Sequence, residues 1–580
     1  EHSMSPSEII QHANNLLQQN KLQQAKKIIL SLIQTAPEHH QAWQVLAQVH
    51  RQLKEQEQYQ QAIKQYEMIA WFNQRLDKAN QHLLNKELKP AENIAHELLK
   101  LVANEYRVLV LLSKIAFQAN DLKTYLAITS HNININSTKS AAYDAHIEAL
   151  FNTKQYLELI SFYNRSTKLV TLLPQSQSLL AAAYVKMMDF KNASLNYQSL
   201  LNKNYYPAYC NLRLGNIEKI IGNNQSAIAY YCKTIKLAPH IGEAYWNLAN
   251  LKTYTFTQLN IANLEQQITI DSNKLNKAQL HFALAKAYEQ QSRYEDAFLQ
   301  LRISNDLQKS LTPYITNDFN ERCKKYLTKK VANTVHTSTE NEVQLIFIVS
   351  LPRSGSTLIE QILASHSHVD ASYELSEINS IAVELENLQI KSNVPYKLNS
   401  LTQDHLAKLA KRYLKFIEPF RNNKPYFIDK QPVNFQHIAL IKTLFPNAKI
   451  IDVQRDKKAT AWSLYKHSFS QGHSYSYDQE DLAHYMNEYY KLMTHWHSVY
   501  PDEIYTINYE SLINNFTETV NDLFEHCNLV VEQACYEFYN NQRPVLTPSS
   551  EQVRKPIYKE ALTDWKKYAN HLTPLLNRLN

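Results

Sequence analysis

Glycine is scarce in this sequence, which has five glycines among 580 residues: Gly215, Gly222, Gly242, Gly355 and Gly472. Asn, Lys, Gln, Ile and Tyr are abundant instead, which indicates a genome-wide compositional bias. A glycine retained against such a bias is expected where the backbone needs conformational freedom. Gly355 falls within a motif described below and is the first candidate for a functional turn.

Cysteines and long apolar runs are also few. The five cysteines show neither C-x-x-C spacing nor the density of a disulfide scaffold, so we expect buried thiols. No apolar run approaches the roughly 18 residues of a membrane span. The start, EHSMSPSEII, lacks the hydrophobic core of a signal peptide, which predicts a cytoplasmic protein. Because Met4 is internal, the alternative that a leader segment was trimmed from the sequence stays open.

Length and charge set the broad class. A chain of 580 residues is expected to form about two to four domains. Its 44% hydrophobic and 20% charged residues are typical of soluble globular proteins. The net charge of +7 is spread along the chain, so it favours anionic partners only mildly and gives no reason to expect nucleic acid.

Residues up to about 325 show helical periodicity, with apolar residues at steps of three and four. A period of 34 residues connects a set of small or apolar positions, namely Ala91, Tyr125, Leu159, Ala193 and Ala227, and Ala297 follows 70 residues later. A small residue there lets the second helix of a hairpin approach the first closely. The pattern resembles the tetratricopeptide repeat family over residues 5–307, with about eight degenerate repeats.

That resemblance implies a superhelix with a concave peptide-binding surface, used to hold a peptide or protein acceptor or to form a homodimer. An array that only stabilises or orients its neighbour is the alternative. We assign residues 1–327 to this array. The polar, Thr-rich stretch TKKVANTVHTSTENE, residues 328–342, loses helical periodicity and is the predicted linker.

In residues 343–580 short apolar runs alternate with helical segments. Four runs are candidate strands: VQLIFIVS, KPYFIDK, AKIIDVQR and DEIYTINY. Continuous apolar strands that alternate with helices predict a parallel sheet covered on both faces. The predicted fold class is therefore an all-α repeat superhelix followed by an α/β domain with a phosphate-binding loop.

The turn LPRSGSTL follows the first predicted strand and opens a helix, which is the layout of a phosphate-binding loop. It is not a Walker A motif, because it has one glycine and no lysine. Arg353 offers a planar fork for phosphate or sulfate oxygens, and the Ser354 hydroxyl adds a donor. The backbone N–H groups expected to converge on one anion, with the helix dipole behind them, belong to Gly355, Ser356, Thr357 and Leu358. An ordinary capped turn would explain Thr357 but not the whole combination.

A second anion site is predicted in IIDVQRDKKATAWSLYKHSF. Arg455 ends a strand there, and an eight-residue offset brings Ser463 of the next helix back over the same point. An ordinary structural Arg-Asp ion pair is the alternative. Together the two sites would hold two separated phosphates, unlike the single run of phosphates in ATP.

These motifs resemble those of sulfotransferases. LPRSGSTL is similar to their 5′-phosphosulfate loop and VQRDKKATAWS to their 3′-phosphate site, which bind 3′-phosphoadenosine 5′-phosphosulfate. Over residues 343–568 the chain looks most like protein-tyrosine sulfotransferases and bacterial sulfotransferases with tetratricopeptide repeats in front. The resemblance implies this nucleotide as co-substrate, adenosine 3′,5′-bisphosphate as product, and no metal. His366 and His368 have no further ligand nearby, so we expect them to be structural.

The resemblance also implies roles for single residues. The general base of the family matches Glu374 in SHVDASYELSEI, although Glu377 is close enough to be confused with it. The lysine that assists the departing phosphate matches Lys430 in FIDKQPVNF, and a nucleotide-contacting tyrosine matches Tyr509 in TINYESL.

The C-terminal segment TPSSEQVRKPIY matches another family motif, which implies Ser549 at the sulfate or bridging oxygen, with Ser550 as a rival. Two positions depart from the family: His467 replaces an arginine after the 3′-site serine, and Asp564 replaces a lysine before the C-terminal tryptophan. The candidate substitutes are Lys555, Lys559 and Lys566.

These residue types suit the transfer of a sulfuryl group to a hydroxyl. A carboxylate, Glu374, takes the proton of the nucleophile, while Lys430 and Ser549 stabilise the charge on the bridging oxygen. Arg353 and the loop N–H groups hold the sulfuryl oxygens. We therefore expect a sulfotransferase whose acceptor is a protein tyrosine. One alternative is a sulfotransferase whose acceptor is a glycan or small-molecule hydroxyl, and another is a scaffold that binds the nucleotide without turnover. A nucleoside kinase would need the Walker lysine, which the loop lacks.

Overall fold

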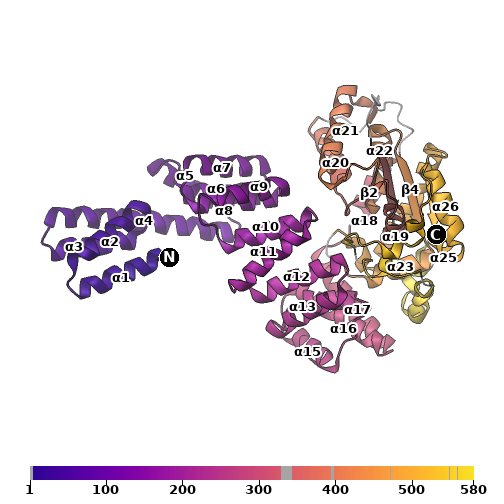
Figure 1. The fold of residues 1–580 in the computed structure, drawn as a ribbon, viewed down its shortest axis with the longest axis horizontal. Helices are drawn as coiled ribbons and strands as arrows, with labels where there is room; N and C mark the ends of the chain where they lie inside the picture. The colour runs from indigo at the N-terminus through magenta and orange to yellow at the C-terminus, as the bar shows by residue number, and fades with distance from the viewer. Residues whose placement is uncertain (1–3, 328–342, 393–397, 470–471, 548, 558) are drawn as a thin grey trace. The chain divides into compact units, whose positions relative to one another are not determined.

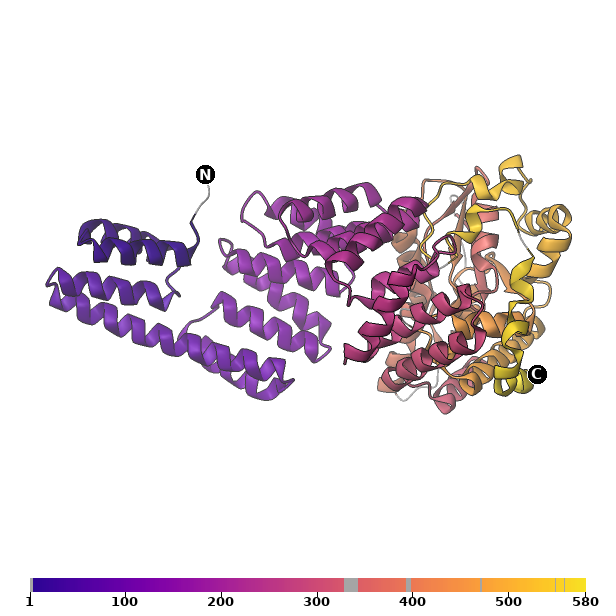
Figure 2. The ribbon, with the colours of Figure 1, turned by 90° about the horizontal axis from the view of Figure 1, so that it is seen from below.

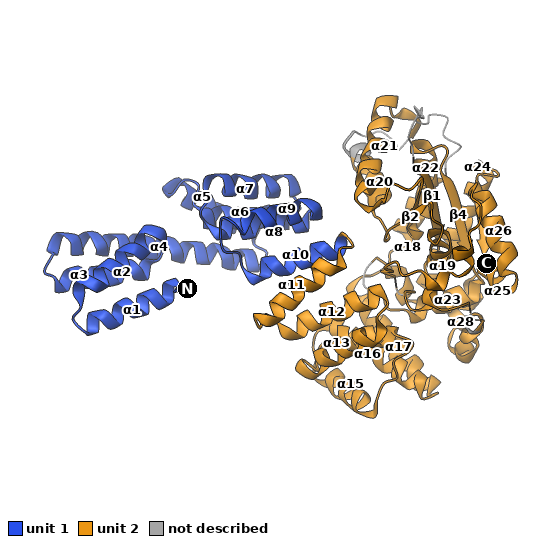
Figure 3. Ribbon diagram, in the orientation of Figure 1, with its two compact units in different colours: residues 1–186 blue, residues 187–580 orange. Residues whose placement is uncertain are grey.

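The computed structural model describes residues 4–327, 343–392, 398–469, 472–547, 549–557 and 559–580. The chain divides into two compact units, residues 1–186 and residues 187–580 (Figure 3). The predicted linker, residues 328–342, lies outside the described residues. The last helical repeats belong to the same compact unit as the α/β domain.

The first unit is helical throughout its described residues, and consecutive helices pack as antiparallel hairpins (Figure 2). Its long α4 packs against both α3 and α5, so one helix serves two successive hairpins. The helices are α1 (Pro6–Gln18), α2 (Leu22–Thr35), α3 (His40–Gln52), α4 (Gln56–Leu84), α5 (Leu88–Leu101), α6 (Tyr106–Gln118), α7 (Leu122–Ile135), α8 (Ser140–Asn152), α9 (Tyr156–Ser166) and α10 (Pro174–Lys186).

The second unit begins with eight further helices: α11 (Phe190–Asn202), α12 (Pro207–Ile221), α13 (Asn224–Leu237), α14 (Gly242–Asn250), α15 (Gln258–Ile270), α16 (Lys274–Gln290), α17 (Tyr294–Leu311) and α18 (Thr316–Tyr326). Every position of the 34-residue series is the fourth residue of its helix and is buried: Ala91, Tyr125, Leu159, Ala193, Ala227 and Ala297. A residue that is buried at the same place in helix after helix marks a close contact between neighbouring helices. This confirms the predicted helical repeats.

The α/β domain contains a five-stranded parallel sheet in the order β2-β3-β1-β4-β5 (Figure 1). The strands are β1 (Gln344–Ser350), β2 (Val369–Ala371), β3 (Tyr426–Lys430), β4 (Lys449–Gln454) and β5 (Ile504–Asn508). All four predicted strands are present. The sequence did not predict β2, because a three-residue edge strand is too short to show a pattern.

Helices cover both faces of the sheet, as predicted. Phe347 and Val349 of β1 belong to the core that contains α21 (Gln403–Ile417), α22 (Ile438–Leu444) and α24 (Gln479–Val499). Ile346 and Ile348 belong to a second core with α19 (Ser356–Ala364) and α26 (Phe516–His526). Successive side chains of a strand point to opposite faces, so each face is buried. The other α-helices of this domain are α20 (Glu377–Ser392), α23 (Lys457–Lys466), α25 (Tyr509–Asn514), α27 (Gln533–Tyr536) and α28 (Thr573–Arg578).

The last repeats and the α/β domain share one apolar core. Buried residues of α16 and α17 belong to the same cluster as residues of β1 and α24. Two hydrogen bonds also join them: Trp246 Nε1 donates to the Ser468 carbonyl at 3.1 Å, and Asn305 Nδ2 donates to the Tyr465 carbonyl at 2.9 Å. These repeats are therefore packed as part of the α/β domain.

None of the described helices combines the length and the apolar content that a membrane crossing needs. Four of the five cysteines are buried as expected, whereas Cys232 is exposed. Tyr231 points into the core, so the adjacent position on α13 faces outward and the expectation of a buried thiol is wrong there.

Candidate active site

The carboxyl ends of four strands meet at one edge of the sheet. Lys430 at the end of β3 pairs in register with Ile348, near the end of β1. Gln454 and Asn508, which end β4 and β5, are paired, so Arg455 and Tyr509 leave the sheet side by side. Ligands of parallel sheets bind beyond this edge.

The loop after β1 has an unusual backbone. Arg353 has φ 64° and Gly355 has φ 101°, both in the left-handed region. A Cβ atom at Gly355 would lie 2.8 Å from Cδ2 of Tyr509, closer than side-chain atoms approach. Gly355 is therefore required both by its own conformation and by the Tyr509 ring, as its retention in a glycine-poor chain predicted.

Helix α19 begins directly after Gly355, and its N-cap position has no side-chain hydrogen bond to the first turn within the part of the chain that the structure describes. The first N–H groups of a helix have no intrahelical acceptor, so those of this turn suit an anion. Ser354, Ser356 and Thr357 are buried around it, and the Thr357 hydroxyl lies 3.1 Å from that of Thr547.

Arg353 and Arg455 connect the loop with the C-terminal segment. Arg353 Nη1 donates to Ser549 Oγ at 3.1 Å. Arg455 Nη1 donates to the Arg353 carbonyl at 3.0 Å, Nη2 donates to the Ala561 carbonyl at 2.6 Å, and its guanidinium lies 5.3 Å from the centre of the Tyr509 ring. Residues from four separate segments thus meet at one place.

A cavity of about 170 Å³ lies at this meeting point. Seven predicted site residues line it: Arg353, Gly355, Leu358, Arg455, Ser463, Tyr509 and Ser549. Both predicted anion sites therefore open into one cavity. Ser549, and not the buried Ser550, lines it. Ser354, Ser356, Thr357, Glu374 and Lys430 are not part of its lining.

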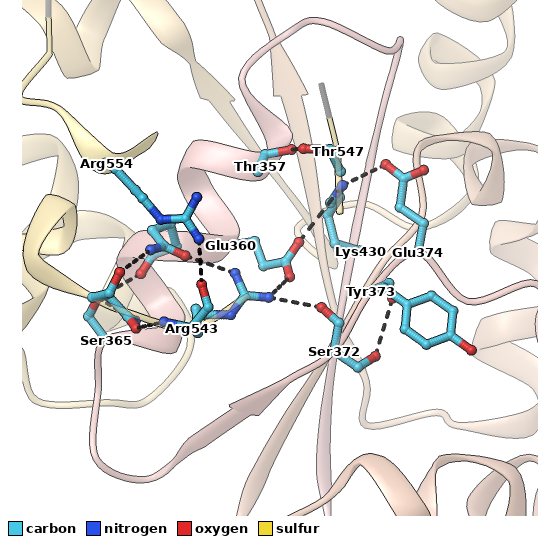
Figure 4. Close-up of polar contacts among 12 residues, drawn as sticks. Thr357, Glu360, Ser365, Ser372, Tyr373, Glu374, Lys430, Arg543, Thr547 and Arg554 are labelled. Atoms are coloured by element: carbon cyan, nitrogen blue, oxygen red, sulfur yellow. Dashed lines mark hydrogen bonds and ion pairs between the residues drawn. The ribbon is translucent and has the colours of Figure 1, made fainter. Parts of the chain in front are cut away.

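Lys430, which ends β3, and Glu374, which follows β2, form an ion pair. Lys430 Nζ donates to Glu374 Oε1 at 2.6 Å and lies 3.8 Å from Oε2 of Glu360, a buried residue of α19 (Figure 4). Lys430 is 3% exposed, whereas the side chain of Glu374 is 40% exposed. The Glu374 carboxylate is therefore open to solvent, whereas Lys430 is buried beside it.

Glu377, the rival of Glu374, has a different partner. Its Oε1 accepts a hydrogen bond from Arg412 Nε of α21 at 2.8 Å, and its side chain is 9% exposed. Burial raises the pKa of the Glu377 carboxyl, although Arg412 opposes the shift. Glu377 therefore belongs to an ion pair between helices.

Two site residues were missed from the sequence. Arg543 donates to Glu360, to Gln361 Oε1 at 2.8 Å and to the Ser372 carbonyl at 2.9 Å (Figure 4). Arg543 and Lys430 thus hold the Glu360 carboxylate from both sides. A charged residue within the apolar stretch TLIEQIL was the available signal for Glu360, whereas Arg543 lies in an irregular segment with no pattern.

The cavity is strongly cationic. Its lining has two carboxylates, those of Glu289 and Asp564, and six cationic side chains: Lys252, Lys286, Arg353, Arg455, Lys466 and Lys555. Burial lowers the pKa of Lys252 to about 7. The charges of Arg353, Lys466 and Lys286 also lower this pKa, whereas the charge of Glu551 raises it. Burial likewise lowers the pKa of Lys466 to about 8. The site is thus arranged to accept negative charge.

The two positions that depart from the family pattern both line this cavity. Burial, with Arg353 and Lys219 nearby, holds the pKa of His467 well below its ordinary value, so this ring is neutral. Asp564 Oδ2 lies 4.0 Å from Lys466 Nζ. Of the three expected substitute lysines only Lys555 lines the cavity. Within the described part of the chain, no group of three or more His, Cys, Asp or Glu side chains could hold a metal ion.

Both parts of the chain are similar to known proteins. The model of the sulfotransferase family matches residues 345–533, and a tetratricopeptide repeat model matches residues 10–70. An uncharacterized protein of Aquifex aeolicus (strain VF5) is 29% identical over 410 residues, which are 68% of this chain and 54% of that protein. The protein-tyrosine sulfotransferase of Drosophila melanogaster is 26% identical over 256 residues, 42% of this chain and 51% of that protein.

Among solved structures, the sulfotransferase domain from the curacin biosynthetic pathway is 17% identical, with a TM-score of 0.28, over 41% of this chain and 99% of that domain. The chain spans about half the length of the two relatives named above. The chain therefore carries tetratricopeptide repeats followed by a domain of the sulfotransferase family.

Proposed function

We propose that this protein transfers a sulfuryl group from 3′-phosphoadenosine 5′-phosphosulfate to an acceptor hydroxyl. The observation that carries the proposal is the cationic cavity between the Arg353 loop and Arg455, together with the Lys430–Glu374 pair beside Glu360 of α19, the helix that follows the loop. A nucleotide with two separated anionic groups fits two anion-binding segments that open into one cavity. The sulfotransferase-family domain supports the same co-substrate class.

In the proposed reaction the acceptor oxygen attacks sulfur in line with the leaving phosphate. One S–O bond forms as the S–O bond to the 5′-phosphate breaks, and its electron pair stays on the phosphate oxygen. Glu374 takes the hydroxyl proton: its Oε1 accepts from Lys430, and a carboxylate has further lone pairs at Oε2. Lys430 and Ser549 stabilise the charge on the leaving oxygen, and Arg353 with the loop N–H groups holds the sulfuryl oxygens.

We propose a protein tyrosine as the acceptor, because the Drosophila relative and the human protein-tyrosine sulfotransferase 1, which is 28% identical over 126 residues, carry that name. The exposed carboxylate of Glu374 supports an acceptor that enters from the surface. The peptide held by the repeats, the homodimer and the cytoplasmic location expected from the sequence stay predictions.

The experiment is a transfer assay with radiolabelled co-substrate and three acceptor classes: acidic tyrosine peptides, sugars and simple phenols. Label in the peptides alone is the expected result. Label in sugars or phenols but not in peptides would refute the tyrosine acceptor and keep the sulfotransferase. Binding of the nucleotide without transfer to any acceptor would favour a scaffold without turnover.

A further inference from the structure

The last repeats form one wall of the cationic cavity. Lys252, which follows α14, and Phe282, Lys286 and Glu289 of α16 all line it, together with residues of the Arg353 loop and of α23. These repeats share an apolar core with the α/β domain, so the wall is a fixed part of the same compact unit.

Hydrogen bonds hold this wall in place from the side of the α/β domain. The Lys252 backbone N–H donates to Glu551 Oε2 at 2.7 Å, and Tyr568 OH donates to Glu289 Oε2 at 2.8 Å. Lys286 Nζ lies 3.1 Å from Oε1 of the same Glu289. The carboxylate of Glu289 thus orients Lys286 from the repeats and Tyr568 from the C-terminal segment at the rim of one cavity.

The cavity also has buried polar atoms that a ligand could satisfy. Trp462 Nε1 and His467 Nε2 have no hydrogen-bond partner among the described residues, and both residues line the cavity while being over nine-tenths buried. A buried polar group without a partner is costly, so such atoms mark a place where a bound molecule completes the hydrogen bonding.

We propose that Lys252 and Lys286 bind the anionic co-substrate, so that the last tetratricopeptide repeats complete the nucleotide site of the sulfotransferase domain. The proposal rests on the proposed function for the identity of the ligand. Two of the six cations around the cavity come from the repeats, and both line it together with Arg353 and Lys466. The repeats then have a role in co-substrate binding that is separate from any role in acceptor recognition.

The test is calorimetric binding of adenosine 3′,5′-bisphosphate to the full chain. Lys252→Met and Lys286→Met keep the aliphatic stem and remove the charge, and each is expected to weaken binding about tenfold, as for a lost charge-assisted hydrogen bond. Lys274→Met is the matched control, because Lys274 is exposed on the same helix as Lys286 and does not line the cavity. It should bind like the unmodified protein.

The outcomes separate the two proposals. If the unmodified protein does not bind the bisphosphate, the proposed function itself is wrong. If it binds, and Arg353→Met weakens binding while both single lysine variants and their double variant bind normally, the contribution of the repeats is refuted and the proposed function stands. Should Lys252→Met fail to fold, Lys286→Met decides the question, because the Lys286 side chain is 31% exposed and methionine keeps its aliphatic stem.

Discussion

Replacing Gly355 by alanine tests the geometry of the loop at a single atom. The backbone there has φ 101°, which costs a non-glycine residue roughly 1–2 kcal/mol. The new Cβ would also lie 2.8 Å from Cδ2 of Tyr509, so the ring must move. Tyr509 lies against the Arg455 guanidinium, so its displacement disturbs both anion sites together.

We expect Gly355→Ala to weaken bisphosphate binding more than tenfold, which corresponds to about 1.4 kcal/mol, in a calorimetric titration. Gly472→Ala is the matched control, because Gly472 has φ 80° and no atom of the described residues lies within 4 Å of its Cβ position. The substitution carries a similar backbone cost without a contact like that of Tyr509, so it should lower the thermal midpoint and leave binding unchanged. Equal binding by both variants would refute the argument that Tyr509 and the loop position the ligand.

Two further predictions concern charge. Because Lys252, with a pKa of about 7, must regain its proton when an anion binds, bisphosphate affinity should fall as the pH rises from 7 to about 9, by at most about tenfold per pH unit for one proton. Titrations in that range check this, and a slope that Lys252→Met does not reduce would contradict it. Glu360→Gln should lower kcat, because Lys430 loses one of its two carboxylate neighbours, while bisphosphate affinity stays the same; unchanged kcat in steady-state assays would show that Glu360 does not position Lys430.

Local patterns were enough to predict four of the five strands and the turn between β1 and α19. Four strands were long and apolar, and Gly355, the one glycine of LPRSGSTL, marked the turn after the first of them. The repeats were predictable because a close-packed residue recurs at the same position of each second helix. Each of these signals lies within a few dozen residues of sequence.

The remainder of the site depends on packing between distant segments. Lys252 and Lys286 come from the repeats, 101 and 67 residues before Arg353. Arg543 reaches Glu360 from 183 residues away, and no local pattern relates them. The sequence could not separate the roles of Glu374 and Glu377, because the hydrogen bond between Glu377 and Arg412 joins two helices and is seen only in the structure.

The most direct test of the account compares the unmodified protein with Glu374→Gln in transfer of radiolabelled sulfate to a tyrosine peptide, with bisphosphate binding measured on the same samples. We expect transfer by the unmodified protein and a loss of at least about a hundredfold in the variant, as for removal of a general base, with binding unchanged. Transfer at the original rate by Glu374→Gln, together with its loss in Glu377→Gln, would show that Glu374 is not the general base.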